Sequence, residues 1–197
     1  MLFKALFTIK ISLSVFIIFV FMVCSLSYIK KLEIIDKNNT KISELNSKIQ
    51  DIEHRTKILE QHINKSKLYA KEFKIDTTLA IYIYFMSTNK KINPAIVFSI
   101  ISIESDFNTN SKSNKNARGL MQVKPATAEI YGVRGYDLYN TKENLKAGIN
   151  HLEWCLKIEN NNLVRALERY NKGNKFSTTN YADKVLRRAS FTYIKQF

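Results

Sequence analysis

The sequence predicts an all-α protein, in which an apolar helix and a polar helical segment precede a larger helical domain. With 5 glycines and 2 prolines among 197 residues, the chain has few of the turn residues that an all-β fold requires. Hydrophobic residues make up 45% of the chain, which is enough for a core, and in most segments they recur at helical spacing. No two segments read as the strands of a β-hairpin.

The first element is an uncharged run over residues 11–29, with lysines on both sides of it. Its length is just sufficient for a helix to cross the hydrocarbon core of a bilayer. We therefore expect residues 1–31 to form a single transmembrane anchor that stays in the mature protein. The flanking lysines do not decide the orientation of this anchor, because they lie at both of its ends.

Two other fates of this apolar run remain open. A cleaved signal peptide usually has a shorter apolar region and ends at a small-x-small site, for which Ser25-Leu26-Ser27 is a weak candidate. Lipidation at Cys24 is the other alternative, although Phe21-Met22-Val23 lacks the small residue that usually precedes a lipidated cysteine. The length of the run favours the uncleaved anchor over both alternatives.

Residues 32–74 are polar, lack glycine and proline, and carry apolar residues on a seven-residue register. This pattern is typical of a coiled coil with polar interruptions. We expect a helical stalk, which could also join two chains as a homodimer; the alternative is a single amphipathic helix that packs on its own domain. One register position holds Ile35, Ile42, Ile49, Thr56, Ile63 and Ala70, and the position three residues later holds Asn38, Leu45, Ile52, Leu59, Ser66 and Phe73.

The signals from residue 75 onward are helical, and residues 75–197 are expected to form one domain. Asp76 and Asn93 are good N-cap residues, and Pro94 stands where a helix tolerates proline. Helices are predicted from Thr77 to Ser87, from Pro94 to about Glu104, from Gly119 to Ile130, from Thr141 through Leu156, from Leu163 to Tyr170 and from Tyr181 to Tyr193.

Glu104 is the leading candidate for a catalytic group. The apolar residues from Ala95 to Ile103 cover most of the circumference of the preceding helix, so that helix should lie in the core. Burial and the negative end of the helix dipole both disfavour an ionised carboxylate at its C-terminal end. A glutamic acid that stays protonated near neutral pH can protonate a glycosidic oxygen. The alternative interpretation is an ordinary solvated glutamate at a helix end.

The formal net charge of +14 first suggests a nucleic-acid partner. No recognition motif supports that interpretation, and we expect no nucleic-acid binding; an anionic membrane surface or cell-wall polymer fits the charge equally well. Neither the cysteines nor the histidines have the spacing of metal ligands, so we expect neither a metal nor a cofactor.

Five short motifs in residues 75–197 carry a resemblance to a known family. They are Glu104-Ser105 with Phe107-Asn108; Gly119-Leu120-Met121-Gln122 with Pro125; Asn144 with Ala147-Gly148, Ile149 and Leu152; Tyr170-Asn171 with Gly173; and Tyr181 with Lys184 and Val185. In their order and spacing they resemble the soluble-lytic-transglycosylase-type (SLT) domains of the lysozyme superfamily, which cut the glycan strands of peptidoglycan. The resemblance implies a lysozyme-like helical domain.

The resemblance also implies a reaction and its residues. Glu104 would act first as acid and then as base, cutting the β-1,4 bond between N-acetylmuramic acid and N-acetylglucosamine. The muramic acid C6 hydroxyl would close on C1 and leave a 1,6-anhydro end without consuming water. Substrate contacts are expected from Ser105, Ser113, Met121, Gln122, Tyr170, Asn171 and Tyr181. The chain departs from the family pattern at Lys124, Arg169 and Ser177.

A hydrolase with two carboxylates would need a partner for Glu104. Asp106 comes two residues after Glu104, and two residues on a helix point about 200° apart, so its side chain should face away from that of Glu104. Asp137, Glu143 and Glu153 belong to later elements. The family needs no second carboxylate, because the substrate's own N-acetyl group stabilises the reacting centre.

Together these observations predict a single-pass protein of the bacterial inner membrane, with its catalytic domain in the periplasm or otherwise outside the cytoplasm. Its partners would be peptidoglycan glycan strands and the membrane. Two other functions remain open: a hydrolysing lysozyme of the same fold, and a cell-envelope assembly module with little activity.

Overall fold

The computed structural model describes residues 2–173 and 180–194, with the side chains of residues 2–14 and 191–194 left aside. Ser177, one of the departures from the family pattern, lies outside the described residues. Contacts divide the chain into two units, Met1–Lys57 and Ile58–Phe197, which are described separately below. The domain boundaries expected after residues 31 and 74 stay predictions.

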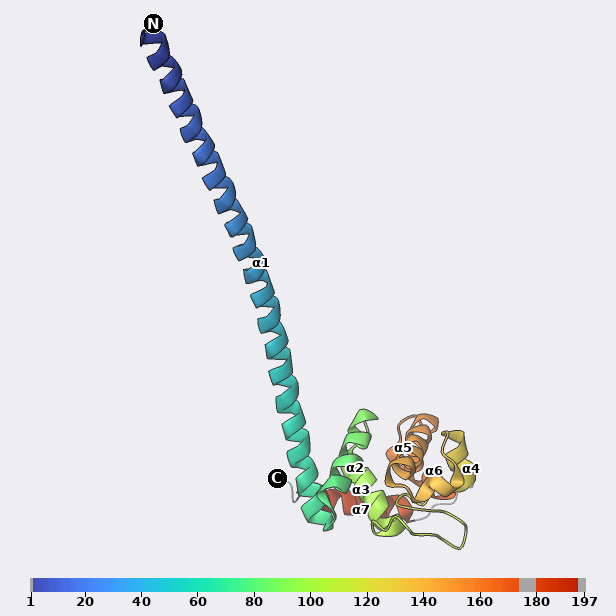
Figure 1. Ribbon diagram of the computed structural model, residues 1–197. Coiled ribbons are helices and arrows are strands. Elements are labelled where there is room, and N and C mark those ends of the chain that lie inside the picture. The colour runs from blue at the N-terminus through green and yellow to red at the C-terminus, as the bar shows by residue number, and fades with distance from the viewer. Residues whose placement is uncertain (1, 174–179, 195–197) are drawn as a thin grey trace. The chain divides into compact units, whose positions relative to one another are not determined.

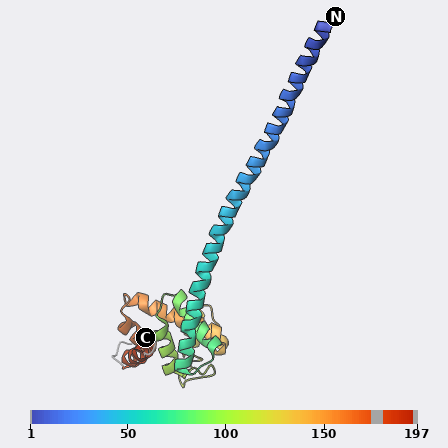
Figure 2. The same cartoon turned by 90° about the vertical axis from the view of Figure 1, so that its left-hand side faces the viewer.

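Helix α1 runs without interruption from Leu2 to Phe73 (Figures 1 and 2). The absence of glycine and proline from this stretch explains its continuity, because these are the residues that most often break a helix. Near its N-terminus the helix is long and apolar enough to cross a membrane, with a mean hydropathy of 2.0 over its most apolar window. A signal sequence would meet the same criteria, so the uncleaved anchor stays a prediction.

The second unit contains the remaining helices. They are α2 (Thr77–Asn89), α3 (Pro94–Ser105), α4 (Pro125–Ile130), the 3₁₀-helix η1 (Gly135–Tyr139), α5 (Thr141–Ile158), α6 (Leu163–Lys172) and α7 (Tyr181–Ile194). No β-strand occurs among the described residues, and the all-α prediction is confirmed. Two isolated bridges join Arg118 to Lys112 and to Val123.

The predicted helix starts are confirmed at four positions by side chains that cap them. The Asp76 carboxylate accepts hydrogen bonds from the backbone N–H groups of Thr78 and Leu79, and the Asn93 side chain accepts one from Ala95. The side chains of Asn140 and Asn162 cap α5 and α6 in the same way. Each cap satisfies an amide that the helix itself cannot pair.

The predicted helix from Gly119 to Ile130 is wrong in its first half. Gly119 and Gln122 have φ values of +72° and +48°, in the left-handed region, so the chain turns there instead of coiling. The helix begins only at Pro125, where the fixed φ of proline suits the first helical position.

Helix α3 lies in the core of the second unit, as predicted. Its residues from Ala95 to Ile101 are buried, and it packs against α2 and α7 (Figure 1). Phe98 stacks on Tyr69 of α1, with ring centroids 4.3 Å apart. Ile103, expected in the core, is 37% exposed because it falls on the outward side of the last turn. The packed helix holds its C-terminal end, and with it Glu104, in a fixed place.

Candidate active site

Glu104 stands in the last turn of α3 with its side chain partly buried. The hydroxyl of Tyr181, from α7, donates a hydrogen bond to Glu104 Oε1 at 2.7 Å. Burial raises the pKa of the Glu104 carboxyl, and the hydrogen bond from Tyr181 opposes that rise by stabilising the charged form. The helix ends directly after this turn, where Asp106 takes a left-handed conformation at the C-cap. A carboxyl with a raised pKa suits a proton donor.

The turn from Gly119 to Val123 is held by Asn144 of α5. The Asn144 amide accepts a hydrogen bond from Met121 N and donates to the carbonyls of Arg118 and Leu138, at 2.7 to 2.8 Å. A side chain at Gly119 would collide with Asn144, and the positive φ there also favours glycine. This buried amide therefore fixes the conformation of the turn.

Two further hydrogen bonds tie the same turn to its neighbours. Ser105 Oγ donates to Leu120 O at 2.8 Å, which joins the end of α3 to the turn. The Tyr170 hydroxyl, from α6, donates to Met121 O, also at 2.8 Å. The Met121 side chain is fully buried against Gly148, where any larger residue would displace it. These contacts hold Glu104, the turn and α6 in one rigid arrangement.

An open cleft of about 680 Å³ lies beside Glu104. This volume falls in the range of small-molecule binding sites. Of the predicted site residues, Glu104, Ser113, Gln122, Tyr170 and Asn171 line it. Ser105, Met121 and Tyr181 are not among its lining residues but support it through the contacts described above. Their predicted roles in binding substrate stay predictions.

Sequence reasoning did not assign His151 and Trp154 to the site, although both line the cleft. Their rings stack with centroids 5.6 Å apart and an interplanar angle of 10°. The His151 ring also lies 5.4 Å from that of Tyr170, and its Nδ1 lies 3.3 Å from the Tyr131 hydroxyl. Burial lowers the pKa of His151, which favours the neutral ring. Two signals were present in the sequence: Trp154 is the single tryptophan of the chain, and His151 lies inside the motif that runs from Asn144 to Leu152.

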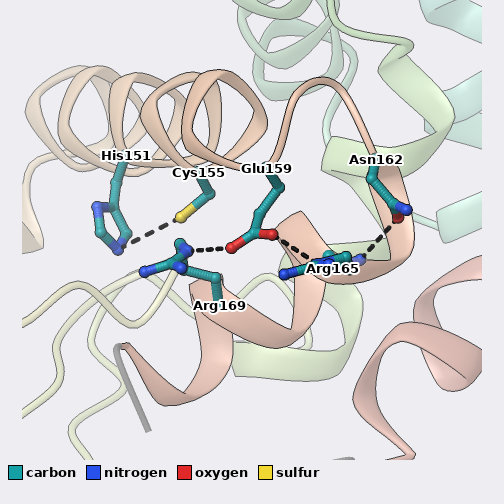
Figure 3. Close-up of polar contacts among 6 residues, drawn as sticks. All are labelled: His151, Cys155, Glu159, Asn162, Arg165 and Arg169. Carbon is teal, nitrogen blue, oxygen red and sulfur yellow. Dashed lines mark hydrogen bonds and ion pairs between the residues drawn. The ribbon is translucent and has the colours of Figure 1, made fainter. Parts of the chain in front are cut away.

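A polar cluster around the buried Cys155 and Glu159 supports this wall of the cleft (Figure 3). His151 and Cys155 come from α5, and Glu159 is the C-cap residue of that helix. Glu159 accepts hydrogen bonds from Arg169 at 2.6 Å and Arg165 at 2.7 Å, both on α6. Arg169 holds the pKa of Glu159 below its usual value. Burial raises the pKa of the Cys155 thiol to about 12, so this cysteine stays protonated. Arg169, which departs from the family pattern, therefore forms an ion pair with Glu159 in this protein.

Three of the four carboxylates considered as partners for Glu104 form ion pairs elsewhere. Asp137 pairs with Arg134 at 3.0 Å, Glu143 with Lys146 at 3.8 Å and Glu153 with Lys90 at 3.0 Å. Among the described residues that line the cleft, Glu104 is the one carboxylate. Within the same described part of the chain, no group of three His, Cys, Asp or Glu side chains could hold a metal ion.

Comparison with known protein families identifies the family of this chain. The family described as the transglycosylase SLT domain matches residues 81–188, which is more than half of the chain. The chain belongs to this family. The SLT match includes Glu104, the turn at Gly119, Asn144, the cleft residues of α5 and α6, and Tyr181. The predicted family resemblance is confirmed.

Relatives of this SLT domain are similar to it over shorter stretches. Membrane-bound lytic murein transglycosylase E of Buchnera aphidicola is 33% identical over 88 residues, which are 38% of this chain and 40% of that protein. Membrane-bound lytic murein transglycosylase C of Actinobacillus pleuropneumoniae is 37% identical over 76 residues, 34% of this chain and 21% of that protein. The chain thus covers less than half of each relative's length.

Solved structures share the fold of the SLT domain. The lytic transglycosylase Slt of Pseudomonas aeruginosa superposes with a TM-score of 0.52 at 22% identity, over 58% of this chain and 24% of that one. The 70 kDa soluble lytic transglycosylase of Escherichia coli gives 0.54 at 18% identity, over 70% and 29% of the two chains. At these identities the likeness shows the fold alone.

Proposed function

We propose that this chain is a membrane-anchored lytic transglycosylase. It cuts the β-1,4 bond between N-acetylmuramic acid and N-acetylglucosamine in peptidoglycan and leaves 1,6-anhydromuramic ends. The observation that carries the proposal is the partly buried Glu104, whose pKa is raised and which stands beside an open cleft. The names of the membrane-bound lytic murein transglycosylases to which the chain is similar support the same function.

The reaction uses one side chain twice. Protonated Glu104 gives its proton to the glycosidic oxygen, and the bond to muramic acid C1 breaks. The carboxylate formed in this step is stabilised by Tyr181, because its hydroxyl donates a hydrogen bond to the oxygen that becomes negatively charged. Glu104 then takes the proton of the C6 hydroxyl as that oxygen closes on C1, and the acid is restored.

The presence of one carboxylate among the described lining residues of the cleft supports a non-hydrolytic reaction. Hydrolysis with two carboxylates needs the second group within about 5 to 9.5 Å of the first, on the far side of the sugar. Among the described lining residues of the cleft, no carboxylate other than that of Glu104 is available for that role. The substrate's own N-acetyl and C6 hydroxyl groups can replace both the second carboxylate and the water.

The substrate contacts belong to the same proposal. Ser113 and Gln122 contact the sugars from the turn side of the cleft, and Tyr170 and Asn171 from α6, because all of them line it. Ser105, Met121 and Tyr181 position the turn and Glu104, and the contacts with substrate predicted for them belong to the same proposal.

The proposal also places the chain in the cell. Residues 1–31 cross the bacterial inner membrane once and stay uncleaved, residues 32–74 form a stalk, and residues 75–197 act in the periplasm or otherwise outside the cytoplasm. The apolar segment of α1 supports the span, and the location of peptidoglycan requires the orientation.

Product analysis tests the function. The full chain, purified in detergent, would be incubated with peptidoglycan and the soluble products analysed by mass spectrometry. We expect anhydromuropeptides, with masses one water below those of hydrolysis products. Reducing muramic ends would instead identify a lysozyme, and the absence of any soluble product would favour an assembly module.

A further inference from the structure

We propose that helix α1 forms a parallel, in-register two-stranded coiled coil with a second copy of this chain. The contact surface, called the seam here, consists of Ile35, Asn38, Ile42, Leu45, Ile49, Ile52, Thr56 and Leu59. Its apolar side chains are 49% to 60% exposed in the single chain. Such a continuous apolar stripe on a long helix indicates an interaction surface.

The residues of the seam favour two strands. In heptad terms position a holds Ile35, Ile42 and Ile49 and then Thr56, and position d holds Leu45 and Leu59, with Ile52 between them as the one isoleucine at d. Isoleucine at a with leucine at d favours a parallel dimer over larger bundles. Asn38, at another d position, adds a polar group that can pair with its own copy across an in-register seam; a buried asparagine at position a is known to fix the register of coiled coils in this way.

Charges beside the seam identify the partner as a second copy. Lys48 and Arg55 occupy position g, while Glu53 and Glu60 occupy position e of the following heptads. In a parallel, in-register coil each g residue faces the e residue of the next heptad on the other strand. Lys48 therefore meets Glu53 of the second copy, and Arg55 meets its Glu60. By symmetry each of these ion pairs occurs twice.

The same charges exclude the antiparallel arrangement. There, g residues face g residues and e residues face e residues. Position g carries Lys41, Lys48 and Arg55, while Glu53 and Glu60 stand at position e, so like charges would oppose one another on both sides of the seam. The span proposed above gives the same answer, since two chains anchored in one membrane leave it in the same direction. That last argument rests on the proposed function, whereas the argument from charge does not.

The contacts of the single chain leave these groups available. Glu53 and Glu60 make no ion pair within the part of the chain that the structure describes, and neither is buried. Lys48 pairs with Glu44 and Arg55 with Asp51 along their own helix, at 2.6 and 2.9 Å, but these exposed pairs are weak and can rearrange. A second copy would give both glutamates partners.

The seam ends where the helix enters its own domain. Beyond Leu59 the same register positions reach Ser66, Ala70 and Phe73, which are buried in the second unit. Because those positions already pack on their own chain, the contact with a second copy is confined to residues 35–59.

Cysteine cross-linking of the full chain in detergent tests the geometry. In a C24S background, L45C places a thiol at position d, where a parallel, in-register coil brings it opposite its own copy. S47C, at the outward position f, is the matched control. We expect rapid disulfide-linked dimer from L45C and little from S47C. Equal cross-linking of the two, or none from L45C, would overturn the proposal.

Charge reversal tests the partner. K48E with R55E should weaken the dimer roughly 10- to 100-fold in sedimentation equilibrium, because the attractive pairs become repulsive. Adding E53K and E60K to the same chain should restore it. A monomer or trimer as the wild-type species, or no rescue, would count against the proposal. These measurements need no activity, so a wild-type chain that dimerises but does not cut peptidoglycan would refute the proposed function alone. E104Q, in which the proposed acid is removed, should dimerise as the wild type does.

Discussion

The hydroxyl of Tyr181 donates a hydrogen bond to Glu104 Oε1 at 2.7 Å, across the contact between α7 and α3. The two residues are far apart in sequence, and both belong to motifs on which the family resemblance rests. Burial and this hydrogen bond act on Glu104 in opposite directions, the first raising its pKa and the second lowering it. Tyr181 therefore adjusts how much of the acid is protonated at a given pH.

The first prediction concerns the effect of Tyr181 on the pKa of Glu104. Tyr181→Phe deletes the donor to the carboxylate, so the pKa of Glu104 should rise further. Activity requires the protonated acid, and it is lost as the pH rises through the pKa of Glu104. The alkaline limb of the pH–rate profile should therefore move to higher pH. Tyr136→Phe, at an exposed tyrosine away from the cleft, should leave the profile unchanged. A shift of the limb to lower pH would contradict the assigned contact.

Glu104→Gln tests the acid itself. The amide keeps the shape of the side chain but cannot give up a proton, so the rate should fall by at least roughly 10² to 10⁴-fold in a turbidity assay. Because the pKa of Glu104 is raised in the folded state, the wild type loses stability as the pH rises through that pKa. The Gln variant has no such loss, and its melting temperature relative to the wild type should increase with pH. Wild-type digestion by the variant would show that another group is the acid.

Asn144→Ala should be the most destabilising change near the cleft. It removes the partner of Met121 N and of the carbonyls of Arg118 and Leu138, all in a buried setting. Leaving such groups unpaired costs about 2 to 4 kcal/mol, which urea unfolding can measure. Activity should fall with stability, because the turn beside Glu104 loosens. Asn89→Ala, at the exposed end of α2, is the control and should change little.

Tyr170→Phe and Gln122→Ala separate binding from packing. The Tyr170 hydroxyl donates to Met121 O, and Gln122 Nε2 donates to the carbonyls of Ser111 and Gly119, so each change costs about 1 kcal/mol of stability. Both residues also line the cleft, and activity should fall much more than that loss explains. A thermal melt beside a turbidity assay distinguishes the effects. If melting temperature and activity fell in proportion, both residues would leave the list of substrate contacts.

The helices could be predicted from the sequence because their signals are local. Asp76 and Asn93-Pro94 predict the starts of α2 and α3, because each lies directly before or at the first turn that it stabilises. The turn at Gly119 could not be predicted in this way, since Asn144, on another helix, decides its conformation. The environment of His151 likewise depends on Tyr131, Trp154 and Tyr170, which only the fold brings together. The family motifs located Glu104 and Tyr170 but did not show that Tyr131 and Trp154 lie beside the His151 ring.

The last prediction concerns the positive charge of the cleft. Lys115 and Lys124 line it and make no ion pair within the described residues, while the neutral form of Glu104 adds no charge of its own. The peptide stems of peptidoglycan carry carboxylates, which these ammonium groups can attract. Lys115→Gln with Lys124→Gln should raise KM for soluble stem-bearing glycan oligomers on the order of 10-fold at low salt, and leave kcat nearly unchanged.

High salt should reduce that difference, because it screens exposed charges. Lys142→Gln, at an exposed lysine outside the cleft, is the matched control and should leave KM unchanged. A fall in kcat at constant KM would instead give these lysines a part in the chemical step. Equal KM values for the wild type and the double variant would show that stem carboxylates do not bind at this position.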